Sequence, residues 1–275
     1  MQLYNKLSKK ERLDLINKAG EKRLTLSFYK YSKIKNTFIF RNFLFVHLER
    51  LNVLGRIYIA SEGINAQLSV PASKLIEFKN LIDSISFLNG VRLNIAIKHS
   101  NEAFLKLKIK IKEKIVADGL NLNDYDLDVH GKHVNAKEFN ELLEDKNTIT
   151  IDMRNHYESE VGHFKGANLP DVDTFRESLP LIKNKYESYK KNRKILMYCT
   201  GGIRCEKASA YLLNNGFKNV YQLNGGIIEY ARQVKENKIE NKFIGKNFVF
   251  DNRLGERISN DIISNCHQCL SLIHI

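Results

Sequence analysis

The chain has 275 residues, of which 43% are hydrophobic and 27% charged, so it is long enough for more than one hydrophobic core. It contains no run of about 20 apolar residues, as a membrane span requires, and residues 1–10 lack the apolar core of a signal peptide, so we expect a cytoplasmic protein. With four cysteines, a disulfide framework is disfavoured, and reactive thiols or metal ligands are the remaining interpretations.

The formal net charge of +13 is distributed unevenly. Residues 1–120 contain 22 Lys and Arg against 10 Asp and Glu, a net +12, whereas residues 121–240 contain 18 of each kind. This asymmetry predicts a basic module that binds a polyanion, joined to a neutral module with another task. A basic but merely solvated face is the alternative interpretation.

The first 100 residues alternate between strand and helix patterns. Apolar alternation predicts strands at 24–29, 56–60, 66–70 and 91–97, and helical spacing predicts helices at 40–51 and from Ser73 to residue 82. The order β-α-β-β-α-β is that of the split-βαβ, ferredoxin-like arrangement.

Residues 104–116 alternate strictly between apolar residues and lysine. An extended segment with this pattern packs one face and exposes a row formed by Lys106, Lys108, Lys110 and Lys112. We expect a basic edge strand, which either contacts RNA or protects the sheet edge from aggregation.

A polar, acidic stretch at 121–128 indicates a domain border, after which the pattern changes. Strands are predicted at 148–152, 195–199 and 219–223, and helices at 136–144, 173–190, 203–214 and 226–234. Strands that alternate with helices imply an α/β domain with a mostly parallel sheet. We therefore expect three parts: a ferredoxin-like basic domain at 1–120, an α/β domain at 121–240 and a C-terminal extension at 241–275.

Cys199 ends a predicted strand of this sheet and is followed by Thr200, two glycines, Ile203 and Arg204. Gly201 and Gly202 allow a tight turn, and the helix that begins near Ile203 directs its positive end at the sulfur. Loop amides, the helix end and Arg204 together lower a cysteine pKa, so we expect Cys199 to be nucleophilic. The alternative is a small buried apolar cysteine.

Four features together resemble the rhodanese homology domain over about residues 128–236. They are Asp152-Met153-Arg154, the segment 162–167 (GHFKGA), the Cys199 loop, and Gly225-Gly226. Dual-specificity phosphatases with a related loop have one more residue between Cys and Arg, so the four residues here favour a cradle for sulfur or another small group.

A second resemblance, to a more specific family, extends over nearly the whole chain. Segments 55–66, 114–119, 152–164, 197–209 and 243–258 are similar to the bacterial tRNA uridine hydroxylases, which contain a rhodanese domain after a ferredoxin-like (acylphosphatase-like) domain. The resemblance implies oxygen-dependent 5-hydroxylation of the wobble uridine of tRNA, with molecular oxygen as co-substrate and Cys199 as the catalytic residue. A rhodanese-type sulfurtransferase that carries a cysteine persulfide is the alternative.

The tRNA anticodon region is thus the expected partner, with no obligate protein partner evident. Arg56 and the lysine row are candidate phosphate contacts. Phe28, Tyr29 and Tyr31 would stack an unpaired base if they are exposed, although aromatic residues in strands more often belong to the core.

Several residues around the loop are assigned supporting roles. Asp152 and Arg154 are expected to brace the loop through hydrogen bonds, and His163 is either a general base or a structural turn histidine. Glu206 and Lys207 follow the loop on the first turn of the helix and are interpreted as solvated.

Two chemical routes remain open. Cys199 thiolate adds to C6 of the uracil, with Arg204 and the loop amides stabilising the resulting enolate, and Cys205 resolves an oxidised Cys199. Alternatively, Cys199 itself carries the oxygen as a sulfenic acid. Neither route requires a metal or organic cofactor.

The tail contains Cys266 and Cys269, a CxxC pair that forms half of a zinc site. The resembled family continues with further cysteines and histidines, whereas this chain ends six residues later. An unmetallated tail is therefore expected, with zinc at the pair as the alternative.

Overall fold

The computed structural model describes residues 3–121, 124–265, 270 and 271. The chain forms two compact units: unit 1 comprises Met1–Val116 with Phe250–Arg253, and unit 2 comprises Ala117–Val249 with Leu254–Ile275. Within the described ranges, no helix combines the length and the apolar composition needed to cross a membrane.

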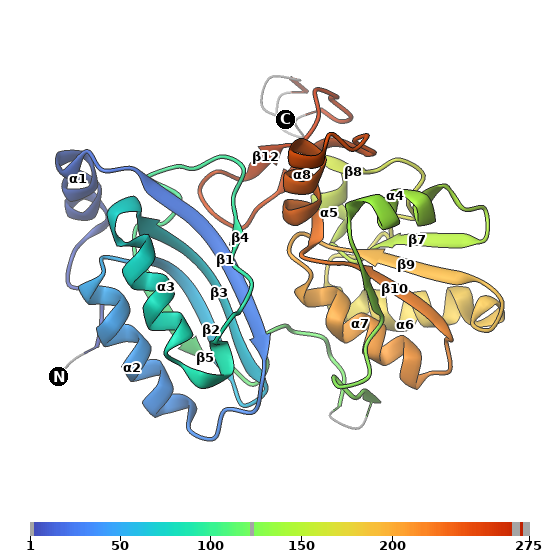
Figure 1. Ribbon diagram of the computed structural model, residues 1–275, viewed down its shortest axis with the longest axis horizontal. Coiled ribbons are helices and arrows are strands. Elements are labelled where there is room, and N and C mark those ends of the chain that lie inside the picture. Colours follow the sequence, from blue (N-terminus) through green and yellow to red (C-terminus); the bar gives the residue numbers. More distant parts are fainter. Residues whose placement is uncertain (1–2, 122–123, 266–269, 272–275) are drawn as a thin grey trace. The chain divides into compact units, whose positions relative to one another are not determined.

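Unit 1 is built on a five-stranded sheet in the order β4-β1-β3-β2-β5 (Figure 1). Its elements are α1 (Lys9–Ala19), β1 (Arg23–Tyr31), α2 (Thr37–Arg50), β2 (Leu54–Ala60), β3 (Gly63–Pro71), α3 (Leu75–Asp83), β4 (Asn94–Ile95) and β5 (Leu107–Ile111). Strand β3 pairs antiparallel with β1 and β2, and β5 pairs parallel with β2. The predicted β-α-β-β-α-β order is confirmed for β1 to β4.

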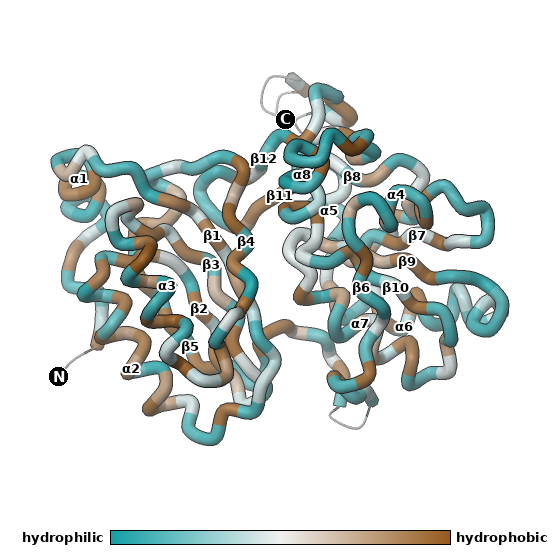
Figure 2. Tube along the Cα trace, in the orientation of Figure 1, coloured by the Kyte–Doolittle hydropathy of each residue, from teal (hydrophilic) through white to brown (hydrophobic). Residues whose placement is uncertain are grey.

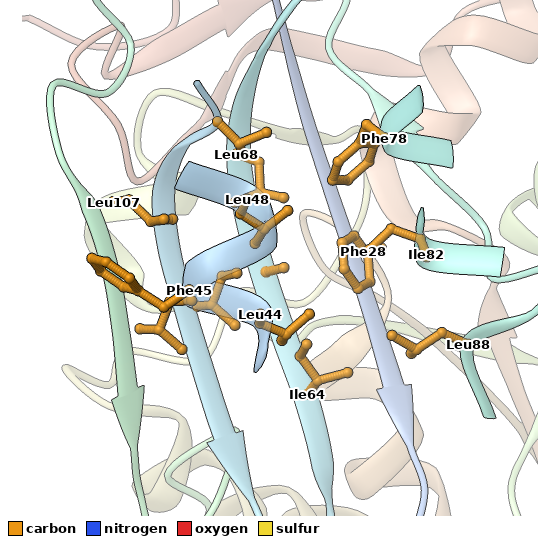
Figure 3. Packing of buried hydrophobic residues seen from close by; sticks show 14 of the residues in the cluster. Phe28, Leu44, Phe45, Leu48, Ile64, Leu68, Phe78, Ile82, Leu88 and Leu107 are labelled. Atoms are coloured by element: carbon orange, nitrogen blue, oxygen red, sulfur yellow. The ribbon is translucent and has the colours of Figure 1, made fainter. Parts of the chain in front are cut away.

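Helices α2 and α3 cover the sheet of unit 1 with apolar side chains. Figure 3 shows Leu44 and Leu48 of α2 over the strands and Phe28 of β1 directed at Phe78 and Ile82 of α3. Phe28 is 2% exposed, so its suggested role in base stacking is wrong: its side chain belongs to the core. Tyr29 and Tyr31 are half-buried and contact each other edge to face.

Two features of unit 1 differ from the sequence-based expectation. Helix α1 was not anticipated, although Ser8 and Glu11 form a capping box and Gly20 ends the helix in a left-handed conformation. Strand β4 is limited to two residues of the expected 91–97 because its pairing with β1 involves Leu26 and Ser27 alone.

Strand β5 forms one edge of the sheet, and its side chains alternate as predicted. Leu107 and Ile109 are buried, whereas Lys106, Lys108, Lys110 and Lys112 are exposed. The pattern weakens at Ile111, which is 44% exposed. Unit 1 thus presents a row of lysines along one sheet edge.

Unit 2 has a four-stranded parallel sheet in the order β6-β10-β9-β7, which confirms the predicted parallel α/β domain. Helices α4 and α8 lie on one face of this sheet, and α6 and α7 lie on the other (Figure 1). The elements are β6 (Lys132–Val134), α4 (Ala136–Glu144), β7 (Thr148–Asp152), α5 (His156–Ser159), β8 (Gly162–Phe164), α6 (Phe175–Tyr186), β9 (Lys194–Tyr198), α7 (Ile203–Asn214), β10 (Asn219–Leu223), α8 (Gly226–Asn237), β11 (Phe243–Phe248) and β12 (Gly255–Arg257).

The central strand β9 is apolar from Ile195 to Met197, as its brown colour in Figure 2 shows, because both faces of the sheet are covered. A small antiparallel sheet, β12-β11-β8, completes unit 2. Strand β11, from the segment expected to form a C-terminal extension, pairs there with β8 of the same unit.

Candidate active site

Cys199 lies directly after the carboxyl end of β9, at the point where the chain turns into α7. Its sulfur accepts a hydrogen bond of 3.2 Å from the amide of Gly202, and the residue is fully buried. Gly202 adopts φ 99°, a conformation that favours glycine, and it is the N-cap of α7. The N-terminus of α7, which carries the positive end of the helix dipole, therefore lies next to the sulfur.

The surroundings of Cys199 favour its thiolate. Burial by itself would raise the pKa of the thiol, but several interactions oppose burial: a hydrogen bond from the Cys205 thiol, the positive charge of Arg204, and the amides of Arg204 and Gly202. Together they lower the pKa to about 6. Burial and the same Cys199 contact raise the pKa of Cys205 well above its ordinary value. At neutral pH, Cys199 is thus the thiolate and Cys205 its thiol donor.

Arg204 is fixed by a carboxylate that sequence reasoning did not identify. Its guanidinium donates two hydrogen bonds to Glu158, with Nη1–Oε1 of 2.6 Å and Nη2–Oε2 of 2.9 Å. The Glu158 side chain is fully buried, and although burial would raise its pKa, the charge of Arg204 holds that pKa below its ordinary value. Glu158 lies 46 residues before Arg204 in the chain, so no local spacing could reveal the pair.

Helix α8 supports the loop of residues 199–204, which is named the catalytic loop here because it carries the candidate nucleophile Cys199. The amides of Ile227 and Ile228 donate to the carbonyls of Cys199 and Thr200, at 3.0 and 3.3 Å. Gly226 has φ +67°, and a Cβ atom there would lie 2.5 Å from the Cys199 carbonyl oxygen. The second glycine of Gly225-Gly226 is therefore required by this close approach of backbones.

Asp152 and Arg154 form a buried ion pair at the end of β7. The Arg154 guanidinium donates to Asp152 at 2.7 Å and to the carbonyl of Gly162 at 2.5 Å, so the pair joins β7 to β8. The amide of Met153 donates to the carbonyl of Tyr198, the residue before Cys199. The contact that fixes Arg204 itself comes from Glu158 rather than from these residues.

His163 on β8 lies beside a pocket of about 600 Å³. One ring nitrogen hydrogen-bonds the Ser159 carbonyl at 2.9 Å, and the pocket is also lined by His156, Glu160 and Pro170. The catalytic loop does not line this pocket. His163 thus lies on a strand paired with β11, and both of its suggested roles stay predictions.

Glu206 and Lys207 are not solvated, contrary to the sequence-based interpretation. Lys207 is fully buried, and its ammonium group lies 2.5 Å from Asp118 and over the ring of Tyr125. Glu206 is partly buried and bonds to His133 and Gln222. Helical periodicity could not show this, because the segments that cover the first turn of α7 come from residues 118–133.

The other residues that the sequence suggested as site residues are described next. Arg56 is half-buried, and its guanidinium donates at 2.9 Å to the carbonyl of Phe250 in the short segment of unit 1 that comes from the end of the chain. Thr200, Gly201 and Ile203 are the partly exposed residues of the catalytic loop. Cys266 and Cys269 lie outside the described residues.

Comparison with known proteins gives two domain matches. Residues 23–115 match the UPF0176 acylphosphatase like domain, and residues 135–233 match the Rhodanese-like domain.

Similarity to curated proteins extends over nearly the whole chain. A tRNA uridine(34) hydroxylase of Leptospira interrogans is 52% identical over 97% of this chain and 72% of the relative. Proteins of the same name from Photorhabdus laumondii and Yersinia pestis are 49% and 50% identical over 97% of this chain, covering 76% and 75% of those relatives.

Proposed function

Because this chain belongs to the tRNA uridine(34) hydroxylase family, we propose that it hydroxylates C5 of the wobble uridine of tRNA with molecular oxygen, using Cys199 as the nucleophile. The observation that carries this assignment is the environment of the Cys199 sulfur, which accepts a 3.2 Å hydrogen bond from the Gly202 amide in a loop that also contains the buried Arg204. These contacts lower the pKa of the thiol to about 6, so the thiolate forms at neutral pH. A thiolate is the form that attacks an electron-poor carbon. We also propose that the reaction takes place in the cytoplasm, because tRNA is its substrate.

In the proposed reaction, the Cys199 thiolate adds to C6 of the uracil and the C5=C6 electron pair moves to C5, forming an enolate. C5 attacks O₂ and gives a C5 hydroperoxide after protonation. Two equivalents of a thiol reductant cleave the O–O bond, releasing water and a disulfide and leaving a hydroxyl group on C5. Loss of the C5 proton and departure of the thiolate from C6 restore the double bond. The sum is uridine, O₂ and two thiols giving 5-hydroxyuridine, water and one disulfide.

We assign separate tasks to the residues around the sulfur. Arg204, held by Glu158, supplies positive charge near the thiolate, and the Gly202 amide donates to it. The base would approach through the partly exposed Thr200, Gly201 and Ile203, since the sulfur itself is buried. Cys205 is adjacent as a neutral thiol, so the alternative route, with a Cys199 sulfenic acid resolved by Cys205, uses the same loop.

The basic face of unit 1 supports tRNA as the substrate. Four exposed lysines lie within β5 or directly beside its ends, and residues 1–120 have a net charge of +12, which suits contact with a phosphate backbone. We assign these lysines to the tRNA backbone and the catalytic loop to the anticodon base.

The test is nucleoside analysis of tRNA from a strain that lacks the gene, complemented with the parent chain or Cys199→Ser. The proposal predicts loss of 5-hydroxyuridine derivatives, restored by the parent alone. Incubation with tRNA containing 5-fluorouridine should trap an adduct on Cys199, identified by peptide mass spectrometry. Continued turnover without any adduct would exclude addition to C6 and leave the sulfenic route.

A rhodanese-type sulfurtransferase is the second candidate, supported by the match of residues 135–233 to the Rhodanese-like domain. It predicts a persulfide on Cys199 and rapid sulfur exchange between thiosulfate and cyanide. Unchanged tRNA in the deletion strain together with rapid exchange would favour it over hydroxylation.

A further inference from the structure

Two histidines and a glutamate meet on unit 2 beside, but outside, the catalytic loop. His130 precedes β6, His133 lies on β6, and Glu206 lies on the first turn of α7. One potential ligand atom from each residue lies within 4.8 Å of the other two. We propose that this His130–His133–Glu206 cluster is a binding site for a zinc-type divalent ion.

The donor set fits this class of ion. Two imidazole nitrogens and one carboxylate oxygen are typical zinc ligands, and a fourth position is left for water. Ligand atoms around a tetrahedral zinc lie roughly 3.3–3.6 Å apart for bonds of about 2.0–2.2 Å. The Nε2 atom of His133 lies 2.9 Å from Oε1 of Glu206, and one ligand atom of the exposed His130 lies within 4.8 Å of a ligand atom of each of these two residues.

Buried partners orient the ligands. Gln222, which is 1% exposed, donates from its amide nitrogen to Oε2 of Glu206 and to the carbonyl of Gly131, both at 3.0 Å. This leaves Oε1 of Glu206 facing His133. One ring nitrogen of His130, Nδ1, lies 3.1 Å from the Gly131 carbonyl, which leaves Nε2 for an ion. Such outer contacts typically fix the orientation of metal ligands.

The glycine between the two histidines keeps the cluster compact. A Cβ atom on Gly131 would lie 2.9 Å from the Cβ of Ser209 and 3.0 Å from the carbonyl oxygen of Val220, so the segment lies directly against α7 and β10. The Gly131 amide also donates to the Ser209 hydroxyl at 2.9 Å. The ligands thus come from the segment at β6 and from α7, which are tied together before an ion binds.

In the ion-free state Nε2 of His133 contacts Oε1 of Glu206 at 2.9 Å, and an ion would replace this contact. Because Glu206 lies two residues after Arg204, an ion here would also join β6 to the turn of α7 that follows the catalytic loop. An ion that binds the folded state alone raises the melting temperature of the protein.

The experiment uses the full chain with Cys266→Ser and Cys269→Ser, which removes the competing CxxC pair. After treatment with a chelator, zinc is titrated by calorimetry, and cobalt(II) is added as a spectroscopic probe. We expect one zinc per chain, a rise in melting temperature, and a cobalt spectrum without a thiolate charge-transfer band. In this background, His130→Ala and His133→Ala should each weaken zinc binding by at least tenfold, whereas His47→Ala on α2 of unit 1 should not.

Three results would each overturn the proposal: no saturable zinc uptake, a thiolate-to-cobalt band that indicates binding at Cys199, or zinc affinity unchanged in His130→Ala. His130 is exposed, so its alanine variant should fold, which circular dichroism checks. Glu206→Gln keeps the shape of the side chain but removes its charge, and it should also lower the affinity.

Discussion

The lysine row at β5 carries exposed charges, whereas the charged residues around Cys199 are buried. Lys106, Lys108, Lys110 and Lys112 are exposed on a sheet edge. Arg204 and Glu158 are buried and bonded to each other within 3 Å. Exposed charges act on a distant polyanion and are screened by salt, whereas buried charges act at short range and are screened little.

This difference separates recruitment of the substrate from activation of the nucleophile. The lysine row should determine how tightly and how salt-dependently a polyanion binds to unit 1. The buried pair should help to lower the pKa of Cys199 and should stabilise unit 2. Each of the following variants changes one side of this comparison and should leave the other intact.

The largest effect is expected from Cys199→Ser, which removes the thiolate. Hydroxylation of tRNA should fall by at least roughly 10³-fold, since removal of a nucleophile typically costs this much or more. Binding of tRNA should be retained, because the lysines are unchanged. Cys205→Ser keeps a hydrogen-bond donor beside the sulfur and is the matched control, with substantial residual rate. Parental hydroxylation by Cys199→Ser would refute the assignment of the nucleophile.

Glu158→Gln should destabilise unit 2 strongly. The variant leaves the guanidinium of Arg204 buried without its counter-charge, which costs about 3–5 kcal/mol in the free energy of unfolding. Urea denaturation measures this cost. Glu141→Gln, an exposed residue of α4, should change stability by less than about 0.5 kcal/mol. Equal stability of the two variants would show that the pair does not stabilise the loop.

Alkylation of Cys199 should depend on pH with a midpoint near 6. The thiolate is the reactive form, so the rate rises as pH increases through the pKa of about 6 and is constant above it. The double variant Glu158→Gln/Arg204→Gln removes both charges of the pair together. It should move the midpoint upward by about 1–3 pH units because the cation beside the sulfur is lost. Iodoacetamide labelling followed by peptide mass spectrometry reads out Cys199 alone.

The smallest effect is expected from replacing the four lysines of the row, Lys106, Lys108, Lys110 and Lys112, by glutamine. Each lysine that contacts a phosphate contributes about 0.7–0.9 to the slope of log affinity against log salt, so the slope should fall by up to about 3–4. The pKa of Cys199 should not change. The control replaces four exposed lysines of unit 2, Lys137, Lys146, Lys191 and Lys235, and removes the same total charge. An equal loss of tRNA binding in both variants would show that net charge matters rather than the lysine row.

The sequence by itself predicted the features that depend on local pattern. Helix 136–144 and strands 148–152 and 219–223 were predicted with the boundaries that the structure has, because caps and apolar periodicity are local signals. The candidate nucleophile was also predicted from local signals, since Cys199, its glycines and Arg204 are neighbours in the chain.

The tertiary structure alone decided which charges are buried and what they contact. Glu158 reaches Arg204 across 46 residues, Asp118 reaches Lys207 across 89, and His133 reaches Glu206 across 73. Each partner comes from a segment that folds onto α7 from elsewhere in unit 2, so no spacing in the sequence indicates it. For the same reason Glu206 and Lys207 were interpreted as solvated. Periodicity shows which residues share a face of a helix, but the segment that packs on that face depends on the whole fold.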